Sequence, residues 1–140
     1  MDERVRAAIF AAVKTEPFCR EMGMDLLFLD DGRSIVEMDF VPERMRNIYG
    51  RAHGGAIFAL IDEAFETSCQ TDGTIAVALN VSVTYVAGPE AGCRLRAESN
   101  RVSQTRKTAS FDIKVSEANG RLLAVCQALA YNTGKPIPFL

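Results

Sequence analysis

The fold is decided by residues 56–71, AIFALIDEAFETSCQT, the longest apolar stretch with helical spacing in the chain. Apolar residues lie on most sides of the helix that this stretch predicts, and Gly73 is its predicted C-terminal cap. A surface helix keeps one clearly polar face, so a helix of this composition is expected to lie in the middle of its domain. The rest of the chain must therefore cover it.

Strand patterns occupy most of the chain on both sides of the helix. Four candidates follow the helix and are separated by short turn sequences: residues 75–86, 93–102, 106–116 and 121–132. Alternating residues at 23–41 predict two earlier strands, with turn chemistry at Asp30-Asp31-Gly32. Sequential hairpins of this kind predict an antiparallel sheet. Because two strands, one apolar helix and four strands follow in order, the sheet has to curl around the helix.

The chain is expected to form a single α+β domain over residues 1–140, because its length matches one domain with one modest core. A short amphipathic helix is predicted at residues 2–16, with Asp2 as its cap and Pro17 as its end. The sheet and the central helix are expected to occupy residues 23–133.

Composition argues against several classes of function. The net charge of −2 gives no basic face for nucleic acid, and no segment has the length and apolar character of a membrane span. Four scattered cysteines and one histidine argue against zinc and against a disulfide framework, so no metal site is expected. The N-terminus has no secretory signal pattern, and free thiols suit a reducing cytoplasm, which is the expected location.

The region before and at the start of the helix is the most informative for function. Residues 42–52 read as a loop, and Gly54 and Gly55 then leave free N–H groups at the positive end of the helix dipole. Such an end can polarise a carbonyl or hold an oxyanion, although the glycines can also serve only to permit a tight turn. His53 is expected to cap or pack this turn, because no G-x-S-x-G motif supplies the serine of a Ser-His-Asp hydrolase.

Three acids interrupt the apolar helix. Asp62 has more apolar helical neighbours, among them Phe58 and Phe65, than Glu63 has. Aspartate is a poor helix former, and desolvation beside two aromatic rings is expected to raise its pKa toward that of a useful base. The alternative is a solvated helix face shared by all three acids.

Two further patterns lie in the predicted strands. Odd-numbered residues from Ile75 to Tyr85 are apolar and are expected on one face of their strand, with Ala78 and Asn80 on the other. A basic cluster surrounds a predicted turn at Ser103-Gln104: Arg101, Arg106 and Lys107. Guanidinium and ammonium groups match the phosphates of a ligand, but the cluster can also be a solvated turn.

Taken together, Asn47, His53-Gly54-Gly55 and Asp62, followed by the long alternating strand, resemble the hotdog-fold thioesterases. The branch that they resemble most is the phenylacetate-pathway (PaaI-like) acyl-CoA thioesterases, and the resemblance covers about residues 22–133. It implies an antiparallel sheet of five to six strands wrapped around a long central helix. It also implies a hydrolase that acts on an acyl-CoA, with a medium-chain or aryl-acetyl group favoured, and that needs no cofactor.

The resemblance implies a role for each matching residue. Asp62 would be the general base on water or the nucleophile, Gly54 would donate its N–H to the thioester carbonyl, Asn47 would orient the thioester or the water, and His53 would support the loop. The residues expected to contact the substrate are Gly55, Phe58, Phe65, Ala78, Asn80, Arg101, Arg106 and Lys107. Relatives often have Ser or Thr where this chain has Ala78, which leaves the partner of the water unassigned.

Spacing adds an inference that does not depend on the family. Gly54 and Asp62 are eight residues apart on one helix, which separates them by roughly 12 Å. A donor and a base that serve one carbonyl each have to lie about 3 Å from it, so they must come from different subunits. We therefore expect a homodimer with the site at its interface, alone or within a homotetramer. The alternatives are a non-catalytic acyl-CoA binding or sensing protein, and a hotdog hydratase or dehydratase.

Overall fold

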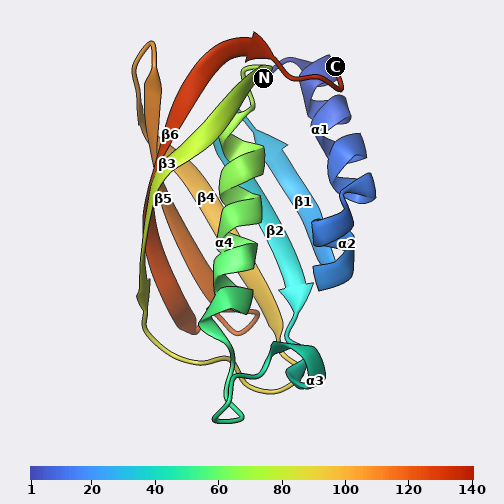
Figure 1. Ribbon diagram of the computed structural model, residues 1–140, viewed down its shortest axis with the longest axis vertical. Coiled ribbons are helices and arrows are strands. Elements are labelled where there is room, and N and C mark those ends of the chain that lie inside the picture. The colour runs from blue at the N-terminus through green and yellow to red at the C-terminus, as the bar shows by residue number, and fades with distance from the viewer.

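The computed structural model describes residues 1–140 as six antiparallel strands that curl around one long helix (Figure 1). The strands are β1 Met24–Asp30, β2 Arg33–Asp39, β3 Thr74–Tyr85, β4 Arg94–Gln104, β5 Thr108–Glu117 and β6 Leu122–Pro136. Their order in the sheet is β1-β2-β4-β5-β6-β3. The predicted α+β class, with an antiparallel sheet around a central helix, is confirmed.

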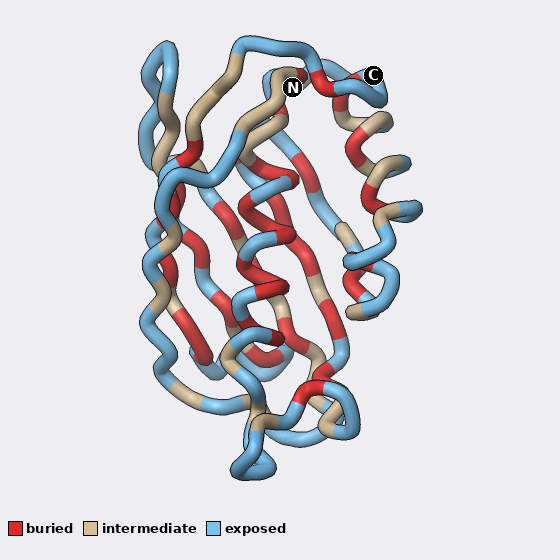
Figure 2. Tube along the Cα trace, viewed as in Figure 1, coloured by how far each residue is buried: buried red, intermediate tan, exposed pale blue.

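The central helix α4, Gly54–Cys69, contacts all six strands and carries much of the core. Leu60, Ile61 and Ala64 are fully buried against the sheet, as the red side of this helix in Figure 2 shows. The helix begins two residues before the predicted stretch, and its C-terminal cap is Gln70, so the prediction of Gly73 as the cap is wrong. Gly73 closes the following turn instead.

The N-terminal segment forms two helices where one was expected: α1 Glu3–Thr15 and α2 Pro17–Met22. The Asp2 cap is confirmed, because its side chain accepts a hydrogen bond from the N–H of Arg4 at 2.8 Å. Pro17 ends α1 as predicted but also opens α2, since the first helical position needs no N–H donor. Both helices pack beside β1. No helix of the chain combines the length and the apolar character that crossing a membrane requires.

Two further predictions need correction. Residues 42–52 are not all loop, because α3 occupies Pro42–Met45 and a bridge joins Arg46 to Ala52. The hairpin of β1 and β2 at Asp30-Asp31-Gly32 is confirmed, but β3 and β4 do not form one. Instead β3 pairs with β6 at one edge of the sheet, and β4 lies between β2 and β5.

A bulge in β3 overturns the predicted alternation of its faces. The register with β6 shifts between Ala78, which pairs with Ala130, and Asn80, which pairs with Leu129. Directly paired residues share a face of the sheet, and Ala130 is buried whereas Leu129 is partly exposed. The extra residue therefore turns Ala78 toward the helix side and leaves Asn80 on the outer side.

Candidate active site

One stripe of α4 is not covered by its own chain. Its exposed residues follow one another at helical spacing: Gly55, Phe58, Asp62 and Glu66. The remaining sides of the helix are largely buried, as the sequence predicted. Phe65 belongs to those buried sides, because its ring packs edge to face on Phe111 with 5.3 Å between centroids. It therefore does not line the stripe that Asp62 shares with Phe58.

The start of α4 offers one free backbone donor. The N–H of Gly55 donates to Nδ1 of His53 at 2.9 Å, and the N–H of Ala56 donates to the His53 carbonyl at 3.0 Å. No group of the chain accepts a hydrogen bond from the N–H of Gly54. The predicted capping role of His53 is thereby confirmed, and the positive end of the helix dipole is left with Gly54 as its available donor.

Close packing accounts for both glycines. A Cβ at Gly55 would meet Nδ1 of His53 at 2.9 Å, and one at Gly54 would meet the ring of Tyr85 at 3.3 Å. The hydroxyl of Tyr85 also donates to the Gly54 carbonyl at 3.1 Å. Tyr85 was not among the residues singled out in the sequence, although its place on the helix-facing side of β3 was a usable signal.

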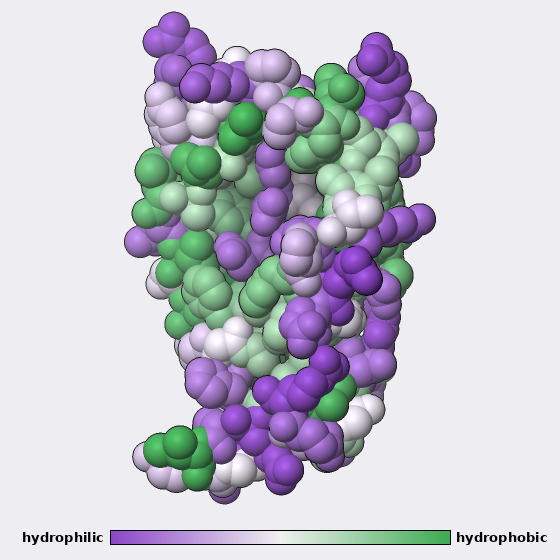
Figure 3. Space-filling view, turned by 45° about the vertical axis from the view of Figure 1, so that its right-hand side comes forward, coloured by the Kyte–Doolittle hydropathy of each residue, from purple (hydrophilic) through white to green (hydrophobic).

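The loop before α4 is held by Asn47. Its side-chain oxygen accepts hydrogen bonds from the N–H groups of Tyr49 and Arg51, at 3.0 and 3.1 Å. The side chain thus organises the turn that leads to His53. Next to it Ile48 is 91% exposed, and Figure 3 shows an apolar tip at the lower end of the molecule, where this loop lies in Figure 1.

The acids of α4 differ in burial and in pKa, and they do so more than the sequence indicated. Desolvation raises the pKa of Asp62, as predicted, although its side chain is exposed along the stripe. The prediction that Asp62 has the more apolar surroundings is wrong, because Glu63 is only 4% exposed. Burial, and then the charges of Glu16, Glu66 and Asp62, raise the pKa of Glu63 to about 8. The N-terminal helices cover this side of α4, and helical spacing alone gives no sign of them.

The predicted substrate-contacting residues lie in separate places. Ala78 faces the helix side of the sheet, whereas the bulge puts Asn80 on the outer side. Arg101 is occupied by an ion pair with Asp31 at 2.8 Å. Lys107 lies over the ring of Tyr131 at 5.5 Å. Arg106 is exposed and takes part in no ion pair of the chain.

These residues provide a free backbone donor at the start of the helix and a carboxylate about two turns further along it, on its exposed stripe. A free N–H at a helix N-terminus stabilises negative charge that develops on a carbonyl oxygen. A carboxylate with a raised pKa can take a proton from water or attack the carbonyl itself. The arrangement therefore supplies both groups that acyl transfer to water requires.

Comparison with known proteins agrees with this chemistry. Residues 49–124, more than half of the chain, match the family model described as the thioesterase superfamily. This match includes the whole of α4 and the free donor at its start.

Relatives match over nearly the whole chain. A putative esterase of Archaeoglobus fulgidus is 30% identical over 99% of this chain and 87% of its own length. The acyl-coenzyme A thioesterase PaaI of Escherichia coli is 27% identical over 91% of this chain and 90% of its own length.

Solved structures share the fold. The structure of the E. coli PaaI protein superposes with a TM-score of 0.90 at 24% identity, over 96% of this chain and 97% of that one. A hypothetical thioesterase of Streptococcus pneumoniae, crystallised with coenzyme A, superposes with a TM-score of 0.76 at 25% identity, over 81% of this chain and 91% of that one. The chain therefore belongs to the thioesterase superfamily, as a PaaI-like hotdog protein and a thioester hydrolase.

Proposed function

We propose that this protein hydrolyses acyl-CoA thioesters to the free acid and CoA, with medium-chain or aryl-acetyl groups favoured. The proposed active unit is a homodimer in which Asp62 of one protomer and Gly54 of its partner act on one substrate. The names of the E. coli relative and of the CoA-bound S. pneumoniae structure support the substrate class. The origin of the E. coli structure in a phenylacetic acid degradation operon supports the aryl-acetyl group.

The observation that carries the proposal is the placement of both groups on one continuous helix. Residues 54–69 form α4 without interruption, so Gly54 and Asp62 lie roughly 12 Å apart. Phe58 lies midway between them on the same stripe. Two antiparallel copies of α4, related by a two-fold axis beside Phe58, would bring each Gly54 opposite the partner's carboxylate.

The edge of the sheet next to this stripe supports such a dimer. β3 pairs only with β6, so its other side presents free backbone groups. Val77, Leu79 and Tyr85 on this strand are each about half exposed. A second copy of β3 would cover these side chains and extend the sheet through main-chain hydrogen bonds. By contrast, a cavity of about 580 Å³ in the single chain lies beside α1 and β1 and includes neither Asp62 nor Gly54.

In the proposed reaction, the thioester carbonyl oxygen accepts a hydrogen bond from the N–H of Gly54. Asp62 either takes a proton from the attacking water or forms an anhydride with the acyl carbon that water then cleaves, and the CoA thiolate leaves in both routes. Asn47 and His53 support the reaction by fixing the loop and the first turn of α4. Phe58 is the aromatic side chain placed beside the acyl group.

The pantetheine and nucleotide part of CoA is assigned to the basic turn between β4 and β5. Arg106 and Lys107 are both exposed and have no carboxylate partner. Arg101 contributes less, because Asp31 already neutralises it. Among the predicted contacts, Gly55 and Ala78 are assigned to the wall of the site, and Asn80 to its outer margin.

Release of free CoA thiol from short, medium, long and aromatic acyl-CoAs tests the proposed substrate class. Asp62→Asn and Asp62→Ala should reduce turnover by about 10²- to 10⁴-fold while CoA binding persists, since only the proton acceptor is lost. Asp112→Asn, the same change at an exposed position on β5, serves as the matched control. Full activity of Asp62→Asn would remove the proposed mechanism, and no turnover on any acyl-CoA would remove the substrate class.

Mixing two inactive variants tests whether the site is shared between protomers. Gly54→Pro deletes the N–H at a position where helices accept proline, and Gly54→Ala adds similar bulk against Tyr85 but keeps the N–H. Random mixtures of Gly54→Pro and Asp62→Asn chains should recover about a quarter of wild-type activity, because half the dimers regain one intact site. A mixture without recovered activity would show that each site lies within one chain.

A further inference from the structure

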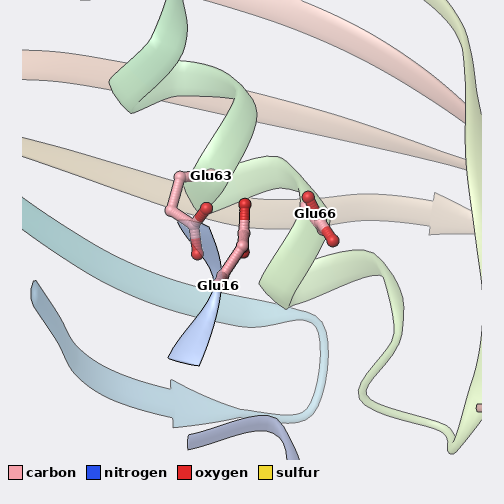
Figure 4. Close-up of side chains that lie close together, drawn as sticks. All are labelled: Glu16, Glu63 and Glu66. Atoms are coloured by element: carbon pink, nitrogen blue, oxygen red, sulfur yellow. The ribbon is translucent and has the colours of Figure 1, made fainter. Parts of the chain in front are cut away.

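Three carboxylates meet in a cleft between α4 and the junction of α1 with α2. Glu63 and Glu66 come from successive turns of the helix, and Glu16 comes from the junction of α1 and α2. Figure 4 shows the carboxylates of Glu16 and Glu63 turned toward each other, with Glu66 beside them. One oxygen from each of the three lies within 4.8 Å of the others. Segments far apart in the sequence thus place three oxygen donors around one point.

Glu63 lacks the partners that a buried carboxylate needs. Its side chain is only 4% exposed, and its buried Oε1 accepts no hydrogen bond from the chain. No ion pair of the chain involves any of the three acids, and the cleft lining contains no Lys, Arg or His. Burying an unpaired carboxylate is costly, and neighbouring negative charges add to the cost. A positive group from outside the chain would offset both.

We propose that Glu16, Glu63 and Glu66 bind one divalent cation of the calcium class, which joins the α1–α2 junction to the central helix. Carboxylate oxygens are the ligands that hard cations prefer, and the cluster offers neither sulfur nor imidazole nitrogen. The argument from the sequence against zinc concerned Cys and His ligands, and this cluster contains neither.

The oxygens lie close enough together to share one ion of the calcium class. Two ligands on opposite sides of one ion are separated by twice the metal–oxygen distance, which is about 4.6–5.2 Å for Ca²⁺ and about 4.0–4.2 Å for Mg²⁺. Oxygens within 4.8 Å of one another can therefore belong to one first coordination shell of Ca²⁺. The cleft, about 540 Å³, has room for the water ligands that complete the shell.

Titration calorimetry of the full-length, metal-free protein with Ca²⁺, Mn²⁺ and Mg²⁺ tests this site. We expect one Ca²⁺ per chain with a Kd of about 1 mM or tighter, and weaker binding of Mg²⁺. Glu63→Gln and Glu16→Gln, which keep side-chain shape, should each weaken binding by about tenfold or more, because ligand charge sets affinity. One variant separates this site from other acids: Glu21→Gln, an exposed position on α2, should bind as wild type.

A stability measurement gives a second readout that does not depend on catalysis. Saturating Ca²⁺ should raise the Tm of wild type relative to EDTA, and this rise should vanish in Glu63→Gln but persist in Glu21→Gln. The proposal is overturned if no ion binds at concentrations up to about 10 mM. It is equally overturned if Glu63→Gln and Glu16→Gln bind like wild type, which would place the ion elsewhere. Neither result would affect the proposed thioester hydrolysis.

Discussion

Glu63 and Glu117 are buried to the same extent, each 4% exposed, yet their surroundings shift their pKa values in opposite directions. Glu117 accepts hydrogen bonds from Arg121 at 2.8 and 3.0 Å and from the N–H of Glu90 at 2.8 Å. These donors lower its pKa to about 2. Glu63 has an oxygen without any donor, and burial together with its acidic neighbours raises its pKa to about 8.

Burial does not by itself define what a carboxylate does, because the groups around it decide its charge. Glu117 ends β5, and Arg121 returns to it across the turn into β6, so the chain provides a cation locally. Glu63 is covered by α1 and α2, which bring Glu16 in place of a cation. A buried carboxylate with donors fixes a turn, whereas one without donors marks a place where an external ligand would be stabilising.

Removing the charge of Glu117, which accepts the hydrogen bonds of Arg121, should give the largest loss of stability. Glu117→Gln leaves the Arg121 guanidinium without its charged partner, and we expect a clear fall in the midpoint of urea unfolding. Glu98→Gln is the control, because the ion pair between Glu98 and Arg96 is partly exposed and should contribute little. Equal effects of the two substitutions would mean that the Glu117 pair adds nothing beyond a surface pair.

The contribution of Glu117 should also depend on pH. Because its folded pKa of about 2 lies below the ordinary value of 4.5, its stabilisation is complete above that ordinary value. It is then lost as the pH falls toward 2. The difference in Tm between wild type and Glu117→Gln should therefore shrink on acidification through this window, and a constant difference would contradict the pairing.

Glu63→Gln should change stability in the opposite direction. In EDTA and near neutral pH, we expect a gain of about 1–3 kcal/mol in the free energy of unfolding, since the substitution removes an unpartnered buried carboxylate. Urea unfolding with and without Ca²⁺ measures this gain, and wild type should regain stability when Ca²⁺ is present. A loss of stability in EDTA would indicate that Glu63 makes a favourable contact in the metal-free chain.

Disrupting a buried pair of uncharged hydroxyls should give the smallest loss in the free energy of unfolding. The hydroxyls of Ser68 on α4 and Ser99 on β4 lie 2.7 Å apart and are both fully buried. Ser99→Ala should cost about 1 kcal/mol by leaving one hydroxyl with fewer partners. The double variant with Ser68→Ala should cost less than the sum of the two single changes, and strict additivity would argue against direct coupling.

Local patterns explain what could be predicted from the sequence. The apolar spacing of residues 56–71 places the central helix, and Asp30-Asp31-Gly32 places the first hairpin turn. His53 could be assigned as a cap because the contact that it makes lies within two residues. The order of strands and helix then restricts the sheet to one that surrounds the helix.

Features that depend on segments far apart in the chain could not be predicted from the sequence. The pairing of β3 with β6 and the bulge next to Leu79 put Ala78 and Asn80 on opposite faces where one shared face was expected, and single-strand alternation contains no sign of this. The burial of Glu63 depends on α1 and α2, since its helical neighbours are ordinary. The roles of Asp62 and Gly54 in catalysis and the shared site remain predictions that the experiments above test.

The two edges of the sheet determine how many copies of the chain can join through it. β1 has a bulge between Leu26 and Phe28, carries Asp25 and Asp30, and has two helices packed beside it, all of which discourage further pairing. Only β3 presents an open edge. A chain with two open edges would polymerise into fibres, whereas one with a single open edge stops growing after one partner has been added. Protection of β1 thus makes strand-mediated assembly self-limiting.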